Sequence, residues 1–180
     1  MTILNADLAA LVRTIPDYPK PGILFRDVST LLLDGPGFRA SIDRLAATLD
    51  GNEIDLIAGI EARGFIVAAA LSYALTKGKL MLRKTNKLPG KTIGINYALE
   101  YGHDRIEIHE GAVKPRNRVL IADDLIATGG TAIAAAELLR GQGAIVSHAR
   151  FLIDLPDLGG ANRLRAAGIE TQALLAFEGD

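Results

Sequence analysis

The sequence predicts a single α/β domain in which a mostly parallel β-sheet is covered by helices on both faces. Three observations predict it. Short apolar, β-branched runs alternate with stretches of helical spacing, which is the pattern of a parallel sheet with helical crossovers. The chain has 180 residues with no internal repeat or long linker, which fits one domain over 1–180. Apolar residues make up 49% of it, enough for a sizeable core and too many for a disordered chain.

Apolar runs predict the strands of the sheet at residues 54–60, 80–82, 118–122, 144–153 and 171–177. Between these strands, helices are expected at residues 65–75, 131–140 and, more weakly, 163–167. Two helices are expected before the first strand, over residues 3–15, ended by Pro16, and over residues 36–49, with a proline in the first turn. Residues 16–22 hold three prolines and a glycine, so they can be neither helix nor central strand. Residues 92–97 and 106–109 predict a small hairpin outside the main sheet.

Composition excludes several classes of protein. The 20 basic and 21 acidic residues give a net charge of −1, which provides no basic excess for nucleic-acid binding. The longest apolar run, residues 65–71, is far shorter than the ~20 residues of a membrane span. The first fifteen residues lack the continuous apolar core of a signal peptide. Cysteine is absent, which excludes disulfides and thiolate metal sites and fits a reducing cytoplasm.

The most informative segment is a strand that leads into two acids and a glycine-rich loop. Asp123 and Asp124 follow the apolar run, and the loop Ala127-Thr128-Gly129-Gly130-Thr131 opens the next helix. Backbone N–H groups at a helix N-terminus favour a phosphate, and glycines let it approach the backbone closely. The two acids suit ribose hydroxyls or a hydrated magnesium ion. An ordinary capped helix is the alternative, but it does not account for the whole combination.

This segment resembles the phosphoribosyl pyrophosphate (PRPP) motif of type I phosphoribosyltransferases. The resemblance implies that Asp123 and Asp124 hold the ribose hydroxyls and that residues 127–131 cradle the 5′-phosphate. It also implies Mg²⁺, bound mainly through PRPP, with contact to Asp123 or Asp124 through water. The motif identifies the class of enzyme but not the base that accepts the ribose.

A second motif, residues 19–27 (PKPGILFRD), is a rigid extended segment that ends in an aromatic and a charged pair. A purely structural brace would also have this composition. The segment is similar to a signature of adenine phosphoribosyltransferases, and the similarity extends over almost the whole chain. It implies that residues 1–35 contribute a base-binding hood and that the backbone near Leu24 and Arg26 reads the edge of adenine.

Glu61, Ala62 and Arg63 follow the strand predicted at 54–60. An arginine at a strand end can bind a diphosphate with two hydrogen bonds, although a salt bridge at a helix start is the alternative. By resemblance, these residues form a pyrophosphate loop with a cis peptide between Glu61 and Ala62. Ala62 stands where the family commonly has serine, so that side chain offers no hydroxyl.

The stretch 62–99 contains no acid and seven positive charges, so the rest of the chain carries −8. Its Pro89-Gly90 loop suggests a mobile lid that brings charge to a polyanion, although a solvated basic face is the alternative. By resemblance, residues 84–110 form a flexible catalytic loop and hairpin, and Lys84 belongs to the substrate site. The resemblance also implies that Arg83 and Lys87 reach the pyrophosphate site of a neighbouring subunit. Glu100 then serves as general acid and base, with Tyr101 beside it in the substrate site.

Together these features imply a purine-salvage enzyme that converts adenine and PRPP to AMP and pyrophosphate, and that forms a homodimer. Arg63, Glu100 and Asp124 are the catalytic candidates, and Asp124 is expected to face solvent. One alternative is an enzyme of the same fold that acts on another purine base. The other is a regulator that senses PRPP or purines without turnover. Such a regulator needs an output surface, which is not evident in the sequence.

Overall fold

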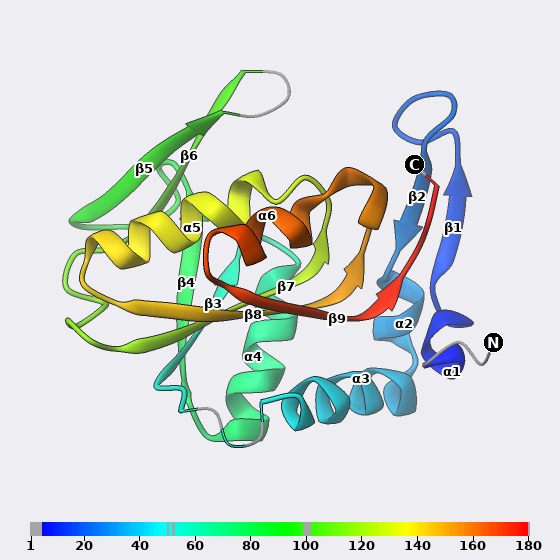
Figure 1. Cartoon of the computed structure of the whole chain (residues 1–180), viewed down its shortest axis with the longest axis horizontal. Helices are drawn as coiled ribbons and strands as arrows, with labels where there is room; N and C mark the ends of the chain where they lie inside the picture. The colour runs from blue at the N-terminus through cyan, green and yellow to red at the C-terminus, as the bar shows by residue number, and fades with distance from the viewer. Residues whose placement is uncertain (1–4, 50, 52, 99–101, 180) are drawn as a thin grey trace.

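The computed structural model describes residues 5–49, 51, 53–98 and 102–179. In this part of the chain, seven strands form one sheet in the order β5-β6-β4-β3-β7-β8-β9 (Figure 1). The neighbours from β4 to β9 run parallel, whereas β5, β6 and β4 pair antiparallel. The strands are β3 (Leu56–Ile60), β4 (Gly78–Lys84), β5 (Thr92–Ala98), β6 (His103–His109), β7 (Arg118–Ile126), β8 (Ile145–Asp154) and β9 (Glu170–Ala176).

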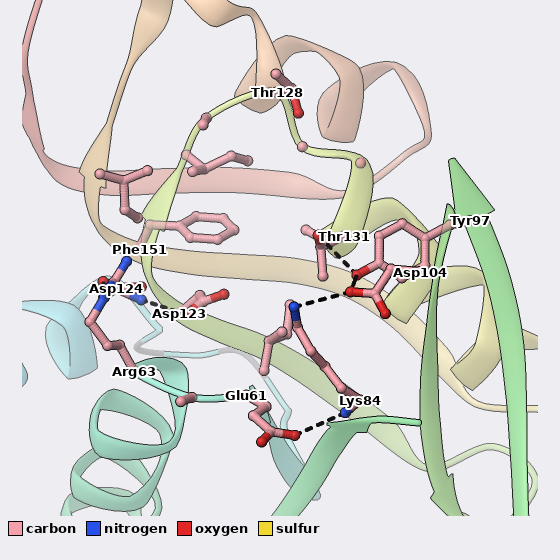
Figure 2. Close-up of a pocket in the computed structure, with 18 residues that line it drawn as sticks. Glu61, Arg63, Lys84, Tyr97, Asp104, Asp123, Asp124, Thr128, Thr131 and Phe151 are labelled. Atoms are coloured by element: carbon pink, nitrogen blue, oxygen red, sulfur yellow. Dashed lines mark hydrogen bonds and ion pairs between the residues drawn. The ribbon is translucent and has the colours of Figure 1, made fainter. Parts of the chain in front are cut away.

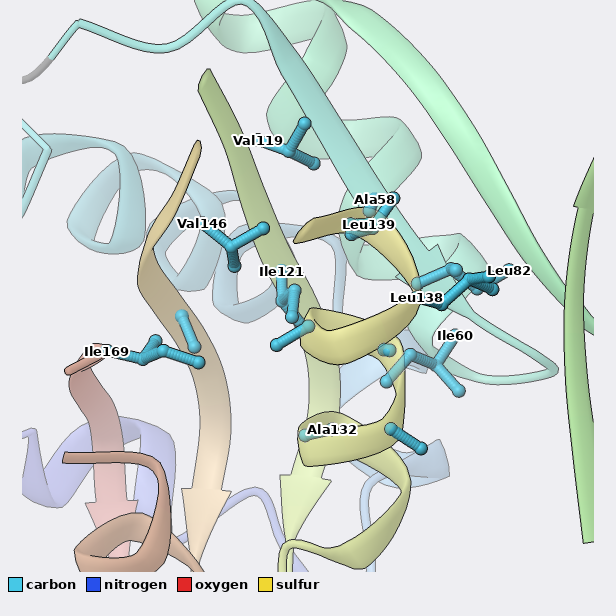
Figure 3. Close-up of a cluster of buried hydrophobic side chains, with 14 of the residues drawn as sticks. Ala58, Ile60, Leu82, Val119, Ile121, Ala132, Leu138, Leu139, Val146 and Ile169 are labelled. Carbon is cyan, nitrogen blue, oxygen red and sulfur yellow. The ribbon is translucent and has the colours of Figure 1, made fainter. Parts of the chain in front are cut away.

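Helices cover both faces of this sheet, as the alternation of strands and helices predicts. One core contains side chains of α2 (Ser29–Leu33), α3 (Gly35–Ala47) and α4 (Gly64–Leu75), and the other contains side chains of α5 (Gly130–Gly141) and α6 (Gly160–Ala166). Successive residues of β7 enter opposite cores: Val119 and Ile121 pack under α5, and Leu120 packs on the other face (Figure 3). Because both faces of the strand are buried over residues 119–122, its sequence is apolar without interruption there.

The hairpin prediction was partly wrong. Strands β5 and β6 do pair with each other, but β6 also pairs with β4, through Arg83↔Glu107 and Lys84↔Ile106, so the hairpin extends the main sheet. Ile106 and Ile108 are 2% and 0% exposed in the core under α5. Burial of these side chains explains why the hairpin stays on the sheet.

The helix predicted over residues 3–15 was also wrong. The structure has only a short helix, α1 (Ala6–Ala9), followed by β1 (Arg13–Pro16), which pairs antiparallel with β2 (Leu24–Asp27) as a separate ribbon. Arg13 and Asp27 form a cross-strand ion pair of 2.5 Å, and hydrogen bonds from Ser29 and Arg13 lower the pKa of Asp27 to about 2. Pairing between strands therefore overrides the helical spacing of this segment.

Most of the remaining elements lie at their predicted places, although α2 was not predicted and β4 and β7 are longer than expected. Helix α3 lies within the expected range 36–49 apart from its first residue, and Asp34 caps it by accepting a hydrogen bond from the Gly37 N–H at 2.7 Å. A 3₁₀ turn, η1 (Pro156–Leu158), precedes α6. Over the described ranges, no helix is long and apolar enough to cross a lipid bilayer.

Candidate active site

A cavity of about 370 Å³ lies where β3 and β7 end and α5 begins (Figure 2). This is the edge of a parallel sheet at which ligands of open α/β folds bind. The cavity gathers most of the residues predicted for the substrate site, namely Glu61, Ala62, Arg63, Lys84, Asp123, Asp124, Ala127, Thr128, Gly129, Gly130 and Thr131. Residues that are far apart in the sequence thus meet around one space.

The glycine loop forms the upper wall of the cavity in Figure 2, between β7 and α5. Gly129 has a φ of +79°, which an L side chain rarely adopts, and it is the N-cap of α5. The first turn of a helix leaves backbone N–H groups without intrahelical partners, so this loop can bind an anion. Helix α6 supports the loop from behind, because the Gly160 N–H donates to the Ala127 carbonyl at 2.9 Å. Arg163 adds a hydrogen bond of 3.1 Å to the carbonyl of Thr128.

The two acids lie within β7 rather than after it, because the strand continues to Ile126. Asp124 is 6% exposed, and its Oδ2 accepts a hydrogen bond from Arg63 Nε. The prediction that Asp124 faces solvent was therefore wrong: the strand was expected to end at residue 122, but it continues past Asp124, which lies under the Arg63 side chain. Arg63 itself remains half exposed, and the bond to Asp124 raises its pKa.

Asp123 differs from its neighbour in having no cation bonded to it in the described contacts. Burial and the adjacent charge of Asp124 raise the pKa of Asp123 well above its usual value. Its Oδ1 accepts a hydrogen bond from the Asp124 N–H at 2.9 Å. Gly64 makes room for it, because a Cβ at Gly64 would lie 2.5 Å from that oxygen. A carboxyl group in this state can accept or share a proton from a bound hydroxyl group.

The loop after β3 has the predicted cis peptide between Glu61 and Ala62. The Glu61 carboxylate accepts two hydrogen bonds of 3.2 Å from the Arg83 guanidinium and one of 2.9 Å from the Lys84 N–H. The Arg83 hydrogen bonds lower the pKa of Glu61. Glu61 therefore joins the pyrophosphate loop to the end of β4. Arg83 also donates to the Lys87 carbonyl at 3.1 Å, and neither Arg83 nor Lys87 lines the cavity.

Two residues of the hairpin, Tyr97 and Asp104, line the cavity although they were not predicted as site residues. Asp104 forms an ion pair of 3.1 Å with Lys84 Nζ, which raises the pKa of Lys84. The Tyr97 hydroxyl lies 3.4 Å from Asp104 Oδ2 and 3.4 Å from Thr131 Oγ1 (Figure 2). The only sequence signal was their place in a predicted hairpin. This chain of contacts joins the hairpin to the glycine loop.

A second cavity of about 280 Å³ lies under the β1–β2 ribbon. Its walls include Tyr18 and Phe25, whose rings meet edge to face at 5.2 Å, together with Arg26. Such an aromatic and apolar site suits a planar base. Leu24, which was predicted to take part, does not line this cavity, whereas Tyr18 and Phe25 were not predicted. Arg63 lines both cavities, so the two spaces share one wall.

Glu100 and Tyr101, predicted as the acid–base residue and its neighbour, lie outside the described residues. Among the cavity-lining residues that the structure describes, four carboxylates (Glu61, Asp104, Asp123 and Asp124) face two cations (Arg63 and Lys84). In that same part of the chain, no cluster of three or more His, Asp or Glu side chains is arranged to hold a metal ion. The protein's own charges therefore do not make this cavity cationic.

Known proteins resemble this chain over almost its whole length. Residues 29–157 match the model of the phosphoribosyl transferase domain family. The chain is 56% identical to an adenine phosphoribosyltransferase from Sphingopyxis alaskensis, over 98% of this chain and 96% of the relative. A crystal structure of adenine phosphoribosyltransferase from Thermoanaerobacter pseudethanolicus superposes with a TM-score of 0.90 at 44% identity, covering 95% and 98% of the two chains. The Saccharomyces cerevisiae enzyme, complexed with an imino-altritol bisphosphate and adenine, gives a TM-score of 0.87 at 35% identity, covering 94% and 97%.

Proposed function

The chain belongs to the phosphoribosyl transferase family, among the adenine phosphoribosyltransferases, and from this premise we propose how its residues move the 5-phosphoribosyl group of PRPP to adenine. The products are AMP and pyrophosphate, which makes this a purine-salvage reaction. The observation that carries the assignment of sites is the position of Arg63, between an anion-binding cavity and an aromatic cavity. A reaction that joins a base to a sugar phosphate requires two such adjoining sites.

PRPP fits the larger cavity in one orientation. The 5′-phosphate lies at residues 127–131, where the loop opens helix α5 and where Thr128 and Thr131 line the cavity (Figure 2). The ribose hydroxyls then reach Asp123 and Asp124 on β7. Carboxylates at this place also favour the positive charge that develops on the ribose ring as the bond to pyrophosphate breaks. The diphosphate lies toward Arg63 and Lys84, which are the cations of the same wall.

Adenine occupies the second cavity, where its ring contacts Phe25 and its edge meets the backbone near Arg26. In this position adenine lies next to the larger cavity, with which its own cavity shares Arg63. Displacement at the anomeric carbon requires its reacting nitrogen to approach the ribose from the side opposite the leaving diphosphate. No covalent nucleophile is needed, because binding aligns the two reactants and excludes water. Leu24 does not line this cavity, so the role proposed for its backbone rests on the family motif alone.

Mg²⁺ fits the charge balance of the site. Four carboxylates against two cations would repel a free diphosphate, and the two aspartates of β7 offer the oxygen atoms that this ion prefers, directly or through water. Mg²⁺ would supply positive charge to the diphosphate when bound together with PRPP. Asp123 and Asp124 would hold the ion, directly or through water, while Arg63 and Lys84 bind the phosphate oxygens.

Glu100 is proposed as the acid–base residue and Tyr101 as its neighbour, on the basis of the family motif. Arg83 and Lys87 are proposed to act toward a second subunit, since neither lines the cavity of its own chain. A homodimer is supported by the outer face of α4, where Ile66 is 43% and Tyr73 is 91% exposed two turns apart. A cytoplasmic location, expected from the cysteine-free sequence, stays a prediction.

Incubation with PRPP, Mg²⁺ and each purine base in turn tests this function. AMP is expected from adenine, with little product from hypoxanthine, guanine or xanthine. Product from another base but not from adenine would assign the chain to a different purine. Tight PRPP binding without turnover of any base would favour a regulator. Omission of the metal is expected to abolish turnover, and the molar mass in solution tests the dimer.

A further inference from the structure

The β1–β2 ribbon, which carries the base cavity, stands apart from the seven-stranded sheet. Its strands pair only with each other in the described part of the chain. Figure 1 shows that the chain leaves the sheet after β9 and that its last described residues run upward beside β2. We call residues 177–179 the tail. The ribbon and the tail come from opposite ends of the described chain and lie side by side.

The tail contacts the ribbon at Arg26. The Arg26 guanidinium lies over the Phe177 ring, 4.7 Å from its centroid, and Arg26 Nη2 donates to the Glu178 carbonyl at 3.1 Å. The same guanidinium donates through Nη1 to Thr14 Oγ1 of β1 at 2.7 Å. Arg26 thus connects three segments: both strands of the ribbon and the tail. A planar guanidinium can stack on a ring and donate to oxygens at the same time, which a lysine cannot do.

The tail is itself fixed to the body of the domain. The Phe177 N–H donates to the carbonyl of Asp154, the last residue of β8, at 3.1 Å. The Gly179 N–H donates to Asp157 Oδ2 in η1 at 2.9 Å. The Phe177 ring is partly buried against the core under α3 and α4. A continuous path of contacts therefore runs from the sheet, through the tail, to the wall of the base cavity.

We infer that the tail is a positioning element of the base site: Phe177 and the Glu178 carbonyl fix Arg26, and thereby hold the β1–β2 ribbon against the adenine-binding cavity. This inference rests on the proposed function, because it assigns adenine to that cavity. Arg26 lines the cavity, whereas none of the three tail residues lines either cavity. The tail therefore acts through Arg26 and not by touching substrate.

The placement of these contacts predicts a selective effect. The tail contacts the ribbon, the end of β8 and η1, and it makes no described contact with Asp123, Asp124 or residues 127–131. Loss of the tail contacts should therefore weaken adenine binding and leave PRPP binding unchanged. A purely structural role would lower stability and affect both substrates alike.

The test compares Phe177→Ala and a chain that ends at Phe177 with the wild type. Both variants are expected to raise the KM for adenine about tenfold, which corresponds to the loss of one stacking contact or one charged hydrogen bond. The KM for PRPP should change by less than about twofold. Phe177→Tyr keeps the ring and should restore the adenine KM. Phe38→Ala is the matched control, because Phe38 of α3 is also half-buried against the same core but does not contact Arg26.

The outcomes separate the inference from the proposed function. A wild-type protein that neither binds nor converts adenine would overturn the proposed function. With an active wild type, an unchanged adenine KM in both folded variants would overturn the role of the tail. Equal increases in both KM values, or the same increase in Phe38→Ala, would show that the tail supports only overall stability. The chain ending at Phe177 retains the buried ring, so it still tests the role of the Glu178 carbonyl if Phe177→Ala fails to fold.

Discussion

Replacing Gly160 with alanine should weaken PRPP binding although the substituted residue does not line the cavity. Gly160 is the first residue of α6 and lies directly behind the glycine loop that is proposed to bind the 5′-phosphate. A Cβ at this position would lie 2.7 Å from the Gly129 nitrogen and 2.9 Å from Ile126 Cγ1, and it would collide with the Ala127 carbonyl oxygen. Two of these three neighbours are backbone atoms of the loop, which cannot turn away as a side chain can.

The size of the effect follows from these distances. Non-bonded carbon atoms are most stable about 3.5–4.0 Å apart, so α6 and the loop must separate by roughly 1 Å. Such overpacking typically costs ~1–3 kcal/mol, which exceeds or cancels the gain of up to ~1 kcal/mol from replacing glycine by alanine in a helix. A displacement of about 1 Å in a binding loop can lower the rate up to about 100-fold. We therefore expect the KM for PRPP to rise about tenfold or more in Gly160→Ala.

Steady-state kinetics with both substrates and thermal unfolding provide the measurement. Gly141→Ala is the control, since Gly141 ends α5 with open space around its Cβ position and no positive φ. The control should be as stable as the wild type or more so, with an unchanged KM for PRPP. The reasoning is refuted if Gly160→Ala behaves like this control, because contact between α6 and the loop would then not determine the geometry of the phosphate site.

Three further predictions concern the carboxylates. Asp124→Asn leaves Arg63 without its charged partner and should lower kcat/KM. It should also lower the free energy of unfolding, measured by chemical denaturation, by about 1–3 kcal/mol. An unchanged free energy of unfolding would mean that the bond to Arg63 contributes nothing to stability. Asp104→Asn releases Lys84 from its ion pair, so pyrophosphate should inhibit this variant several-fold more strongly than the wild type. Equal inhibition of both proteins would contradict the idea that Asp104 competes with pyrophosphate for Lys84. Folding lowers the pKa of Asp27 to about 2, so its interactions stabilise the protein above pH 3.8 and are lost as the pH falls toward 2. The stability difference between wild type and Asp27→Asn should therefore shrink over that range, and a difference that stays constant would exclude this linkage.

The sheet could be predicted because its strands are buried on both faces. In β7, alternate residues of the first half enter two different cores, so residues 119–122 are all apolar and the position of the strand is visible in the sequence. The ribbon could not be predicted in the same way. Leu8 is 1% exposed and fits a helix, but residues 13–16 are fixed by their register with residues 24–27. Such pairing across a short connection leaves no periodic signal in the sequence.

The functional site, too, could be predicted only in part. Asp123, Asp124 and the loop 127–131 are contiguous, so their spacing alone indicates a sugar phosphate. Tyr97 and Asp104 enter the cavity only because the antiparallel register of β5 and β6 places them opposite each other, next to the end of β4. The exposure of Asp124 was misjudged because the end of a strand is hard to locate from sequence. The continuation of β7 past Asp124 turns an expected surface acid into a buried one.

The charges of the site explain why a diphosphate and a ribose can bind together in a cavity with more acids than bases. Arg63 is bonded to Asp124, and Lys84 to Asp104, so each cation of the cavity is already paired with a carboxylate. If Arg63 and Lys84 bind the diphosphate as proposed, it must replace these internal partners, which would limit the affinity for free pyrophosphate and favour its release. We propose that once Arg63 turns to phosphate oxygens, Asp124 is left without its cation. Its charge is then available to the ribose at the stage when positive charge develops on the ring, which is where a carboxylate contributes most to the rate.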